Sequence, residues 1–282
     1  MRIGFIGAGL MGHGMALNLL KGGHEVHVIA HRNRAPIEDL LAKGAREAGS
    51  LDKIAHASDC ILLCLSSSKI VEETVAALKP ALRFGQIIID TGTSEPESTR
   101  RLASELAALG VAYADAPMTG GPEQAASAEL GVLCGASPET FSSILPLLSC
   151  FSATIRHMGP VGSGHAAKLV SNFLVTGMIA LVAQAFGTAR KADIDWRNLY
   201  DVMLNGSGNS GVLRKMVAPA LDGDFEGYRF SLANASKDIG YFKTLASGLG
   251  LETTLVAAVE DVFSGAIAKG HGQKNVSRLL DL

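Results

Sequence analysis

The sequence has little charge of either sign, few aromatic residues and few cysteines. Charged residues make up 18% of its 282 positions and nearly balance, with 25 Lys and Arg against 27 Asp and Glu. A chain this close to neutral lacks the basic face that nucleic acids or anionic membranes require, so we expect neither as a partner. Long charge runs and low-complexity tracts are also absent, which favours a compact α/β enzyme over a fibrous or disordered chain.

The four cysteines and eight histidines show no metal-ligand spacing, so no metal site is expected. Cys60 and Cys64 lie in CILLCL, which is typical of a buried strand, and we expect buried thiols. This fits a reducing, cytoplasmic location. No signal peptide is visible, because RIGFIG at the beginning of the chain already resembles a strand leading into a glycine loop.

Only one long uncharged stretch is present, residues 169–189, and it has about the length of a membrane-spanning helix. It contains Ser171, Asn172, Thr176 and Gln184, and no second stretch of this kind exists. We therefore expect no membrane span but a buried central helix, whose apolar length exceeds what one small domain needs and suggests cover by a second subunit.

Short β-rich runs alternate with helical patterns in the first half, which is typical of a parallel sheet wound by crossover helices. The sequence predicts an α/β fold with a Rossmann-type doubly wound domain over residues 1–162 and an all-α domain over residues 163–282, linked by a long helix. The expected strands are Arg2–Ile6, Glu25–Ala30, Cys60–Leu65, Gln86–Asp90, Ala112–Asp115, Leu130–Cys134 and Ile155–Met158. After the long helix, the expected helices are Trp196–Leu204, Leu213–Leu221, Leu232–Ser247 and Thr253–Ala268.

A G-x-G-x-x-G motif, formed by Gly7, Gly9 and Gly12, follows the first strand and opens a helix. The first glycine makes a tight turn, the second lets the backbone approach a pyrophosphate, and the third lets helix and strand pack closely. In this strand–loop–helix context the motif predicts a dinucleotide site.

The end of the second strand indicates which dinucleotide binds. An acidic residue there would bind the ribose 2′-hydroxyl of NAD, but the sequence has IAHRNR and no acid. Arg32 can form a two-pronged contact with a 2′-phosphate, and His31 adds a donor beside Asn33. We expect NADP in preference to NAD.

Lys168 stands at the head of the apolar stretch, four residues before Asn172, so the two share one helix face. His165 and Thr176 extend the same polar stripe. Because this helix begins at the end of the nucleotide domain, Lys168 is placed where small-molecule clefts form. It could donate a proton to a carbonyl oxygen as hydride reaches the carbon. The alternative is a lysine whose amine merely extends to water.

Four separated motifs carry a resemblance that covers nearly the whole chain. They are GFIGAGLMGHGMALNL, DAPMTGG (Asp115–Gly121), GSGHAAKLVSN (Gly162–Asn172) and FSLANASKDI (Phe230–Ile239). With these motifs the sequence resembles the β-hydroxyacid dehydrogenases of the 3-hydroxyisobutyrate dehydrogenase family, which includes tartronate semialdehyde and glyoxylate/succinic semialdehyde reductases.

The resemblance implies a role for each matching residue. Lys168 would be the catalytic acid/base, and Lys237 would reach the cofactor and the active site from the second domain. Asn172 would hold the substrate, whose carboxylate Thr119 and the amides of Gly120 and Gly121 would bind. The implied cofactor-binding residues also include Gly7, Ala8, Gly9, Leu10, Met11, Gly12, Leu65 and Thr93.

The sequence departs from the family pattern at three places. Met118 and Thr119 replace the usual Val and Ser, Gly92 stands where Ser is frequent, and the loop after Leu65 lacks a proline. The departures leave the exact substrate open. His271 lies in a Gly-His-Gly turn near the carboxyl end and is interpreted as structural.

Together these features predict an oxidoreductase that transfers hydride between NADP(H) and a small β- or γ-hydroxy acid or aldehyde acid, so that its substrate is a small-molecule carboxylate. The resemblance implies a homodimer or homotetramer. Two alternatives remain: an imine reductase on the same scaffold, which usually lacks the lysine, and a non-catalytic NADP-binding protein.

Overall fold

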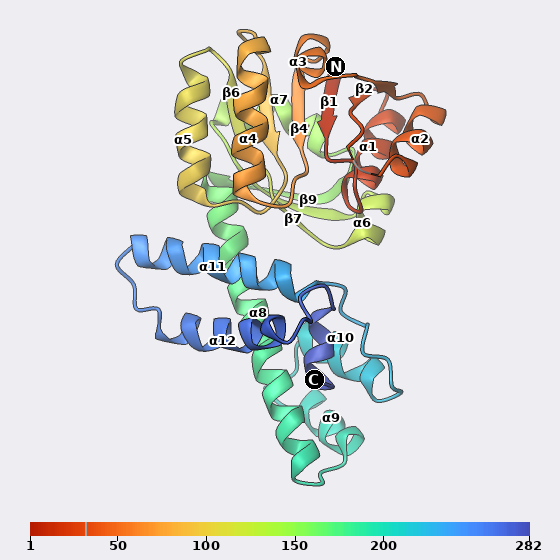
Figure 1. The fold of residues 1–282 in the computed structure, drawn as a ribbon, viewed down its shortest axis with the longest axis vertical. Coiled ribbons are helices and arrows are strands. Elements are labelled where there is room, and N and C mark those ends of the chain that lie inside the picture. The colour runs from red at the N-terminus through yellow and green to blue at the C-terminus, as the bar shows by residue number, and fades with distance from the viewer. Residues whose placement is uncertain (32) are drawn as a thin grey trace. The chain divides into compact units, whose positions relative to one another are not determined.

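A computed structural model describes residues 1–31 and 33–282. The chain forms two compact units, Met1–Lys168 and Leu169–Leu282 (Figure 1). The division falls within the long helix α8 (Ser163–Lys191), whose first residue is the expected start of the second domain.

The amino-terminal unit is built on a nine-stranded sheet in the order β3-β2-β1-β4-β5-β6-β8-β7, with β9 paired to β8. The sequence order runs outward from β1 in both directions, which defines a doubly wound, Rossmann-type sheet and confirms the predicted fold class. The strands are β1 Arg2–Ile6, β2 Glu25–Val28, β3 Arg46–Glu47, β4 Cys60–Leu63, β5 Ile87–Asp90, β6 Ala112–Asp115, β7 Met118–Thr119, β8 Leu130–Gly135 and β9 Ser152–Gly159.

Strand direction changes beyond β6. The pairs from β3 through to β6 are all parallel, whereas β8 runs antiparallel to both β6 and β7. The expected parallel arrangement is right for the first six strands, whereas β8 and β9 pair parallel with each other but run opposite to β6. Because β6 and β7 are both antiparallel to β8, the chain reverses between β7 and β8, across α6 (Pro122–Ser127).

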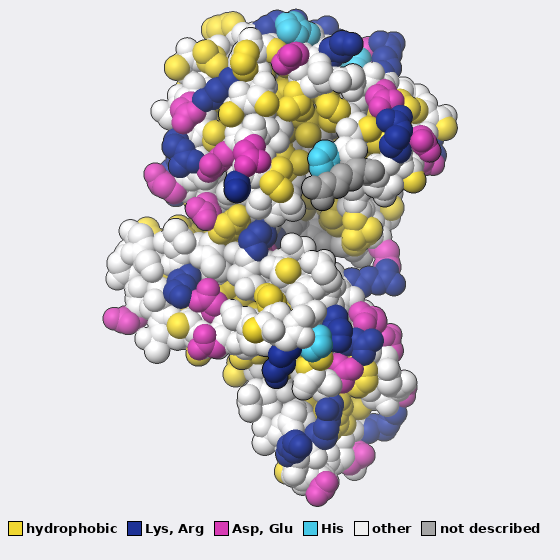
Figure 2. All heavy atoms as spheres, viewed as in Figure 1, with side chains coloured by type: hydrophobic (Ala, Val, Ile, Leu, Met, Phe, Trp, Pro, Cys, Tyr) yellow, Lys and Arg dark blue, Asp and Glu magenta, His cyan; other side chains and the backbone are white. Residues whose placement is uncertain are grey.

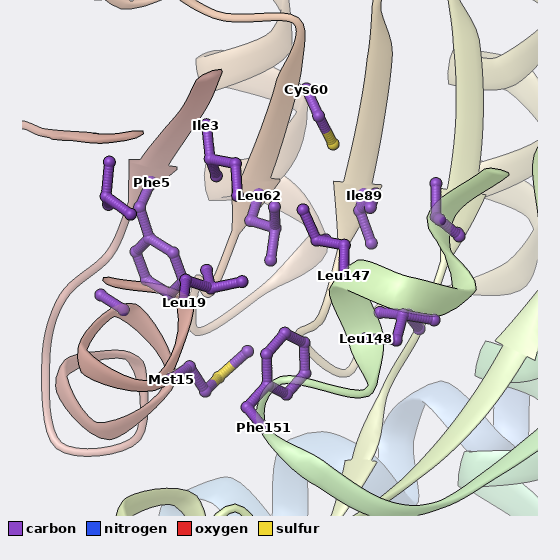
Figure 3. Packing of buried hydrophobic residues seen from close by; sticks show 14 of the residues in the cluster. Ile3, Phe5, Met15, Leu19, Cys60, Leu62, Ile89, Leu147, Leu148 and Phe151 are labelled. Carbon is purple, nitrogen blue, oxygen red and sulfur yellow. The ribbon is translucent and has the colours of Figure 1, made fainter. Parts of the chain in front are cut away.

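Alternation along each strand explains how the sheet is covered on both faces. Ile3 and Phe5 of β1 join one buried cluster and Ile6 joins another, as the two-residue period of a strand requires. The first cluster also contains side chains of α1, α2 and α7, some of which Figure 3 shows, and the second contains side chains of α3, α4 and α5. Figure 1 correspondingly shows α4 and α5 on one face and α7 on the other. Their bounds are α1 Gly12–Lys21, α2 Ala35–Ala42, α3 Leu51–Ala57, α4 Ser68–Leu78, α5 Pro96–Ala107 and α7 Pro138–Leu148.

The carboxyl-terminal unit is helical, as predicted. Three helix starts are set by a side-chain oxygen that accepts a backbone N–H of the first turn, from Asp195, Ser210 and Ser231. The cap at Ser210 explains why one helix begins two positions before the expected Leu213. The helices after α8 are α9 Trp196–Leu204, α10 Gly211–Ala220, α11 Leu232–Gly248 and α12 Thr254–Ala268, followed by a short 3₁₀ turn at Val276–Leu280. A second short 3₁₀ turn, Lys79–Ala81, lies in the amino-terminal unit.

Helix α8 is less buried within the structure than its composition predicts. Of the described helices, it alone has the length and apolarity to span a membrane, yet only 33% of its most apolar window is buried. Ile179 and Phe186 are fully buried in the core of the helical unit, while Val170, Leu174 and Leu181 are 57%, 65% and 71% exposed. One apolar face of α8 is therefore not buried within a single chain, and the expected cover of this helix by a second subunit stays a prediction.

Candidate active site

The carboxyl ends of β1, β4, β5 and β6 lie at one edge of the sheet, because these strands are parallel neighbours. The loops that follow them begin at Gly7, Cys64, Thr91 and Ala116. The fold thus brings the predicted cofactor-binding segments to the edge where doubly wound sheets bind their ligands.

The glycine loop after β1 has the shape that the motif predicts. Gly7 adopts φ +103°, and a Cβ at this position would collide with the carbonyl of Cys64. A Cβ on Gly12 would collide with the carbonyl of Gly7 and lie 2.9 Å from the Phe5 ring, so close packing between helix and loop requires glycine. At Gly9 a Cβ would meet no described atom within 4 Å, which leaves its backbone open to a ligand.

The amino terminus of α1 is available to an anion. No side chain caps it and its first turn holds no acidic residue, so its backbone N–H groups and helix dipole favour a phosphate. Leu10 in the loop is 81% exposed, Met11 precedes the helix directly, and Ala8 packs against the sheet core. These features fit a dinucleotide pyrophosphate.

The loop after β2, predicted to bind the 2′-phosphate, is exposed at His31 and Asn33, and Arg32 lies outside the described residues. The Asn33 side-chain oxygen accepts the N–H of Ala35 at 3.1 Å and so helps to start α2. Arg34 donates two hydrogen bonds, of 3.0 and 3.1 Å, to the carboxylate of Glu47 on β3. Glu47 therefore neutralises one of the two arginines of this loop.

Leu65 and Thr93, expected beside the ribose and nicotinamide, are half-buried and follow neighbouring strands, β4 and β5. Gly92 lies in the loop after β5, close to the loop after β4. A Cβ on Gly92 would lie 2.7 Å from the carbonyl oxygen of Leu65. The glycine that departs from the family pattern is thus the residue that this close approach requires.

The predicted substrate loop contains β7. Thr119 is exposed and pairs with Gly131 of β8, and its hydroxyl lies where a side chain at Gly131 would otherwise stand. Gly120 is exposed with φ +111°. The N–H of Gly121 donates to the Gln124 side-chain oxygen at 2.8 Å, so this amide must exchange its partner before it can bind a substrate carboxylate.

The predicted catalytic lysine is half-buried. Lys168 lies in the second turn of α8, and Asn172 follows one turn later on the same face. The other two members of the predicted polar stripe, His165 and Thr176, are fully buried. The stripe therefore divides into two half-buried polar residues and two internal ones.

Within the helical unit, Asn172 and Lys237 share one carboxylate. The side-chain amide of Asn172 donates to Oδ2 of Asp238 at 2.7 Å, and Lys237 Nζ lies 3.0 Å from Oδ1 of Asp238. Lys237 Nζ also lies 5.0 Å from the centre of the Tyr241 ring. Asp238 is 4% exposed, and sequence reasoning assigned it no role although it follows Lys237 directly.

The four cysteine side chains are buried or partly buried. Burial raises the pKa of Cys60 to about 12 and that of Cys64 to about 11, so both remain thiols at neutral pH. Cys134 is buried as well, and Cys150 is partly buried. Across residues 1–31 and 33–282, no group of three His, Cys, Asp or Glu side chains could hold a metal ion.

Charged side chains of both signs are intermingled over each unit on the face that Figure 2 shows. This distribution agrees with the net charge of -2. It gives no indication of a nucleic-acid partner.

Comparison with known proteins agrees with this geometry. Residues 2–159 match the model for the NAD binding domain of 6-phosphogluconate dehydrogenase, and residues 162–282 match the NAD-binding model of NADP-dependent 3-hydroxyisobutyrate dehydrogenase. The chain is 32% identical to 2-(hydroxymethyl)glutarate dehydrogenase of Eubacterium barkeri, over 99% of this chain and 94% of that protein. It is 29% identical to 2-hydroxy-3-oxopropionate reductase of Escherichia coli, over 99% and 96%.

A solved structure from the same family of enzymes has a similar fold. The 3-hydroxyisobutyrate dehydrogenase of Mycobacterium tuberculosis, determined with L-serine, superposes with a TM-score of 0.90 at 25% identity, over 99% of this chain and 98% of that one. Both family models describe nicotinamide-cofactor domains, and the relatives match the chain over nearly its whole length. The chain belongs to the β-hydroxyacid dehydrogenases of the 3-hydroxyisobutyrate dehydrogenase family, which are nicotinamide-dependent oxidoreductases.

Proposed function

We propose that this protein reduces a small aldehyde acid with NADPH, or oxidises the matching β- or γ-hydroxy acid with NADP. The observation that carries the proposal is Lys168, a half-buried lysine at the beginning of α8 in the same compact unit as the dinucleotide edge. A protein that only bound the dinucleotide would have no use for a proton donor in this unit.

In the proposed reaction the bound nicotinamide supplies the hydride. Lys168, in its ammonium form, donates a proton to the carbonyl oxygen as the carbon is reduced, and its amine accepts the hydroxyl proton in the reverse direction. Thr119 and the Gly120 amide bind the substrate carboxylate, joined by the Gly121 amide once Gln124 releases it. Asn172, oriented by Asp238, holds the substrate, and Lys237 adds positive charge.

The NADP preference rests on the loop after β2. It offers His31 and Arg32 and no acidic residue where NAD-dependent relatives of the fold carry a carboxylate. The same loop keeps Arg34 paired with Glu47, so the proposal assigns the 2′-phosphate to Arg32, with His31 and Asn33 beside it.

We further propose a cytoplasmic homo-oligomer, dimeric or tetrameric, in which a second copy covers the exposed face of α8. Val170, Leu174 and Leu181 recur at helical spacing along this face. An apolar stripe of this length is unusual on a monomer in water, and a second copy is the partner that symmetric assembly provides.

The first test is NADPH oxidation by the purified protein with succinic semialdehyde, glyoxylate, tartronate semialdehyde and methylmalonate semialdehyde, and with NADH in parallel. Fast turnover of one acid with NADPH supports both the reaction class and the cofactor. Equal or better catalytic efficiency with NADH contradicts the NADP assignment. Turnover of cyclic imines but not of these acids would favour the imine reductase alternative.

The second test is Lys168→Ala, with Lys191→Ala at the exposed end of the same helix as its matched control. The Lys168 variant should fold and bind NADPH while losing nearly all turnover, and the control should keep it. Retained turnover in Lys168→Ala would contradict the proposed mechanism. NADPH binding by the native protein without any turnover would favour the non-catalytic alternative.

A further inference from the structure

A cluster of buried polar side chains lies where α8 begins, wholly within the amino-terminal unit. Asp90 and Asp115 end the neighbouring strands β5 and β6, and both are 0% exposed. His165, in the first turn of α8, is 0% exposed, and Thr99 of α5 is 1% exposed. Buried charges are costly unless they are paired and hydrogen-bonded, so this cluster calls for an explanation.

The hydrogen bonds of Thr99 indicate where His165 carries its protons. The Thr99 hydroxyl lies 3.1 Å from the carbonyl of Glu95, to which it donates, so it accepts from Nδ1–H of His165 at 2.8 Å. The other ring nitrogen, Nε2, lies 3.6 Å from Oδ2 of Asp90 and has no hydrogen-bond partner among the described residues. The ring is thus held at Nδ1 by Thr99 of α5, while Nε2 faces the carboxylate of Asp90.

Asp115 connects the same cluster to the backbone of α8. Its Oδ1 accepts the N–H of Gly162 at 2.6 Å, and its Oδ2 accepts the N–H of His165 at 2.7 Å and lies 3.8 Å from His165 Nδ1. A carboxylate at this place satisfies N–H groups that a helix start leaves without partners, and it interacts favourably with the helix dipole. Asp115 thus binds both the connector before α8 and its first turn.

The remaining contacts define the charge around His165. Asp90 accepts the N–H of Gly92 at 2.9 Å and the hydroxyl of Ser94 at 2.8 Å. Burial raises the pKa of Asp115, against the opposing effects of the His165 charge and of three backbone amides. Burial and these two carboxylates raise the pKa of Tyr113 far above its ordinary value, so its hydroxyl stays neutral. The charged groups facing the imidazole are therefore Asp90 from β5 and Asp115 from β6, while α5 contributes the neutral Thr99.

Two glycines pack directly against Asp115. A Cβ on Gly135 would lie 2.5 Å from Asp115 Oδ1, and one on Gly164 would lie 2.9 Å from Asp115 Oδ2. Neither position has room for a side chain, so the carboxylate and the first turn of α8 hold a single arrangement.

We propose that His165 is a positioning residue for Lys168: bonded to Thr99 and packed between Asp90 and Asp115, it fixes the first turn of α8 on the carboxyl ends of the strands and thereby places the lysine one turn later. This inference rests on the proposed catalytic role of Lys168. A displacement of about 1 Å at a proton donor lowers turnover by about 100-fold, so the cluster acts on rate without touching substrate.

The test compares His165→Leu with His165→Gln and with the control His157→Leu. His157 lies on β9 of the same unit, where it stacks on Phe141 and its Nε2 bonds the carbonyl of Ala136 at 2.9 Å. In assays with the fastest substrate of the panel, kcat of His165→Leu should fall by about 10- to 100-fold. The dissociation constant for NADPH and the KM for the acid should change little. His165→Gln, which can donate a hydrogen bond to Asp90, should recover part of kcat, and His157→Leu should keep all of it.

Two results would overturn the proposal. One is a kcat for His165→Leu equal to that of the native protein. The other is a parallel loss of kcat, NADPH binding and thermal midpoint in both His165 variants, which a purely structural role would produce. If His165→Leu does not fold, Thr99→Val takes its place, since it removes the acceptor of Nδ1–H, and the same split between kcat and KM decides.

A second measurement needs no substrate. In the full chain with ¹⁵N-labelled histidine, the imidazole signals missing from His165→Gln belong to His165. Nδ1 of His165 should carry a proton, and an unprotonated Nδ1 would contradict the hydrogen bond to Thr99. Failure of the inference can be told from failure of the proposed function. An active Lys168→Ala contradicts the proposed catalytic role of Lys168 whatever the His165 spectrum shows, whereas an inactive Lys168→Ala beside a fully active His165→Leu contradicts only the positioning role.

Discussion

The side-chain amide of Asn172 donates a 2.7 Å hydrogen bond to Oδ2 of Asp238, 66 residues away in the sequence. The same carboxylate lies 3.0 Å from the ammonium of Lys237. One buried acid therefore orients both residues of the helical unit that we propose to contact substrate.

Asp238→Ala should weaken substrate use more than cofactor binding. A hydrogen bond to a charged group contributes about 1.5–3 kcal/mol, so kcat/KM for the acid should fall by about 10- to 100-fold. The dissociation constant for NADPH, measured by fluorescence titration, should change far less. Asp222→Asn, at an exposed ion pair with Arg197 in the same unit, is the matched control and should leave kcat/KM unchanged. An unaltered kcat/KM in Asp238→Ala would remove the orienting role.

Arg32→Ala and Arg34→Ala should separate two neighbouring arginines. The 2′-phosphate is assigned to Arg32, so its loss should raise the KM for NADPH by at least about 10-fold, the energy of one charge-assisted contact, and leave the KM for NADH unchanged. Arg34 already binds Glu47, so its loss should change the NADPH/NADH ratio much less. Initial rates with both cofactors measure the ratio, and equal effects of the two substitutions would argue against the assignment.

Gly92→Ser, which restores the residue frequent in the family, should destabilise this protein. The new Cβ would stand 2.7 Å from the carbonyl oxygen of Leu65, and overpacking of this kind costs about 1–3 kcal/mol. Thermal unfolding measures the loss. Gly49→Ser is the control, because its nearest described neighbour would be the flexible end of Lys53, at 3.7 Å. A thermal unfolding midpoint for Gly92→Ser at or above that of the native protein would show that the loop accommodates the side chain without loss of stability.

The ion pair between Arg2, at the beginning of β1, and Asp59, just before β4, should make the stability of the protein depend on pH. The hydrogen bond from Arg2, helped by its charge, lowers the pKa of Asp59 below the ordinary 3.8. The pair therefore stabilises the fold above that pH, and the stabilisation is lost as the pH falls through the lowered value. Because both side chains are exposed, Asp59→Asn should lower the free energy of unfolding by less than about 1 kcal/mol at neutral pH. Its thermal midpoint should converge with the native one in acid, whereas that of Glu73→Gln, an exposed residue of α4, should follow the native midpoint at every pH.

Leu174→Glu combined with Leu181→Glu should lower the mass measured by light scattering at micromolar concentration. Both residues are exposed apolar side chains of α8, 65% and 71% accessible, and a carboxylate there opposes burial by a second copy. Leu109→Glu, at a 45% exposed position of the other unit, should leave the mass unchanged. A native protein that is already monomeric would contradict the proposed assembly.

Elements with strong local signals were predictable from sequence. The strand Arg2–Ile6, the glycine loop after it and the start of α8 at Ser163 lie where the pattern indicates. The strands β3 and β7 were not predicted, because each has only two residues and shows no period. The reversal of β8 was not predicted either, because the chain turns back across the short helix α6, between β7 and β8.

The partners of the site residues were harder to predict, because they lie far apart in the sequence. Asp238 is 66 residues from Asn172, and His165 is 66 residues from Thr99, so no local spacing connects them. His165 fitted the polar stripe of Lys168 by helical period, yet the fold buries it completely. How much of α8 a single chain buries could not be predicted, because composition does not distinguish a core helix from one that another copy covers.

The continuity of α8 across Lys168 and Asn172 restricts how this protein can be recombined with its relatives. Each helical residue turns the chain by about 100°, so inserting or deleting one residue between these two positions would move them to different faces. A chimera that joins the nucleotide half of one enzyme to the helical half of another can be spliced inside residues 163–191 only if it preserves the helical phase. Substitutions at Thr119 or Met118 carry no such restriction, which makes that loop the more accessible place to change substrate preference.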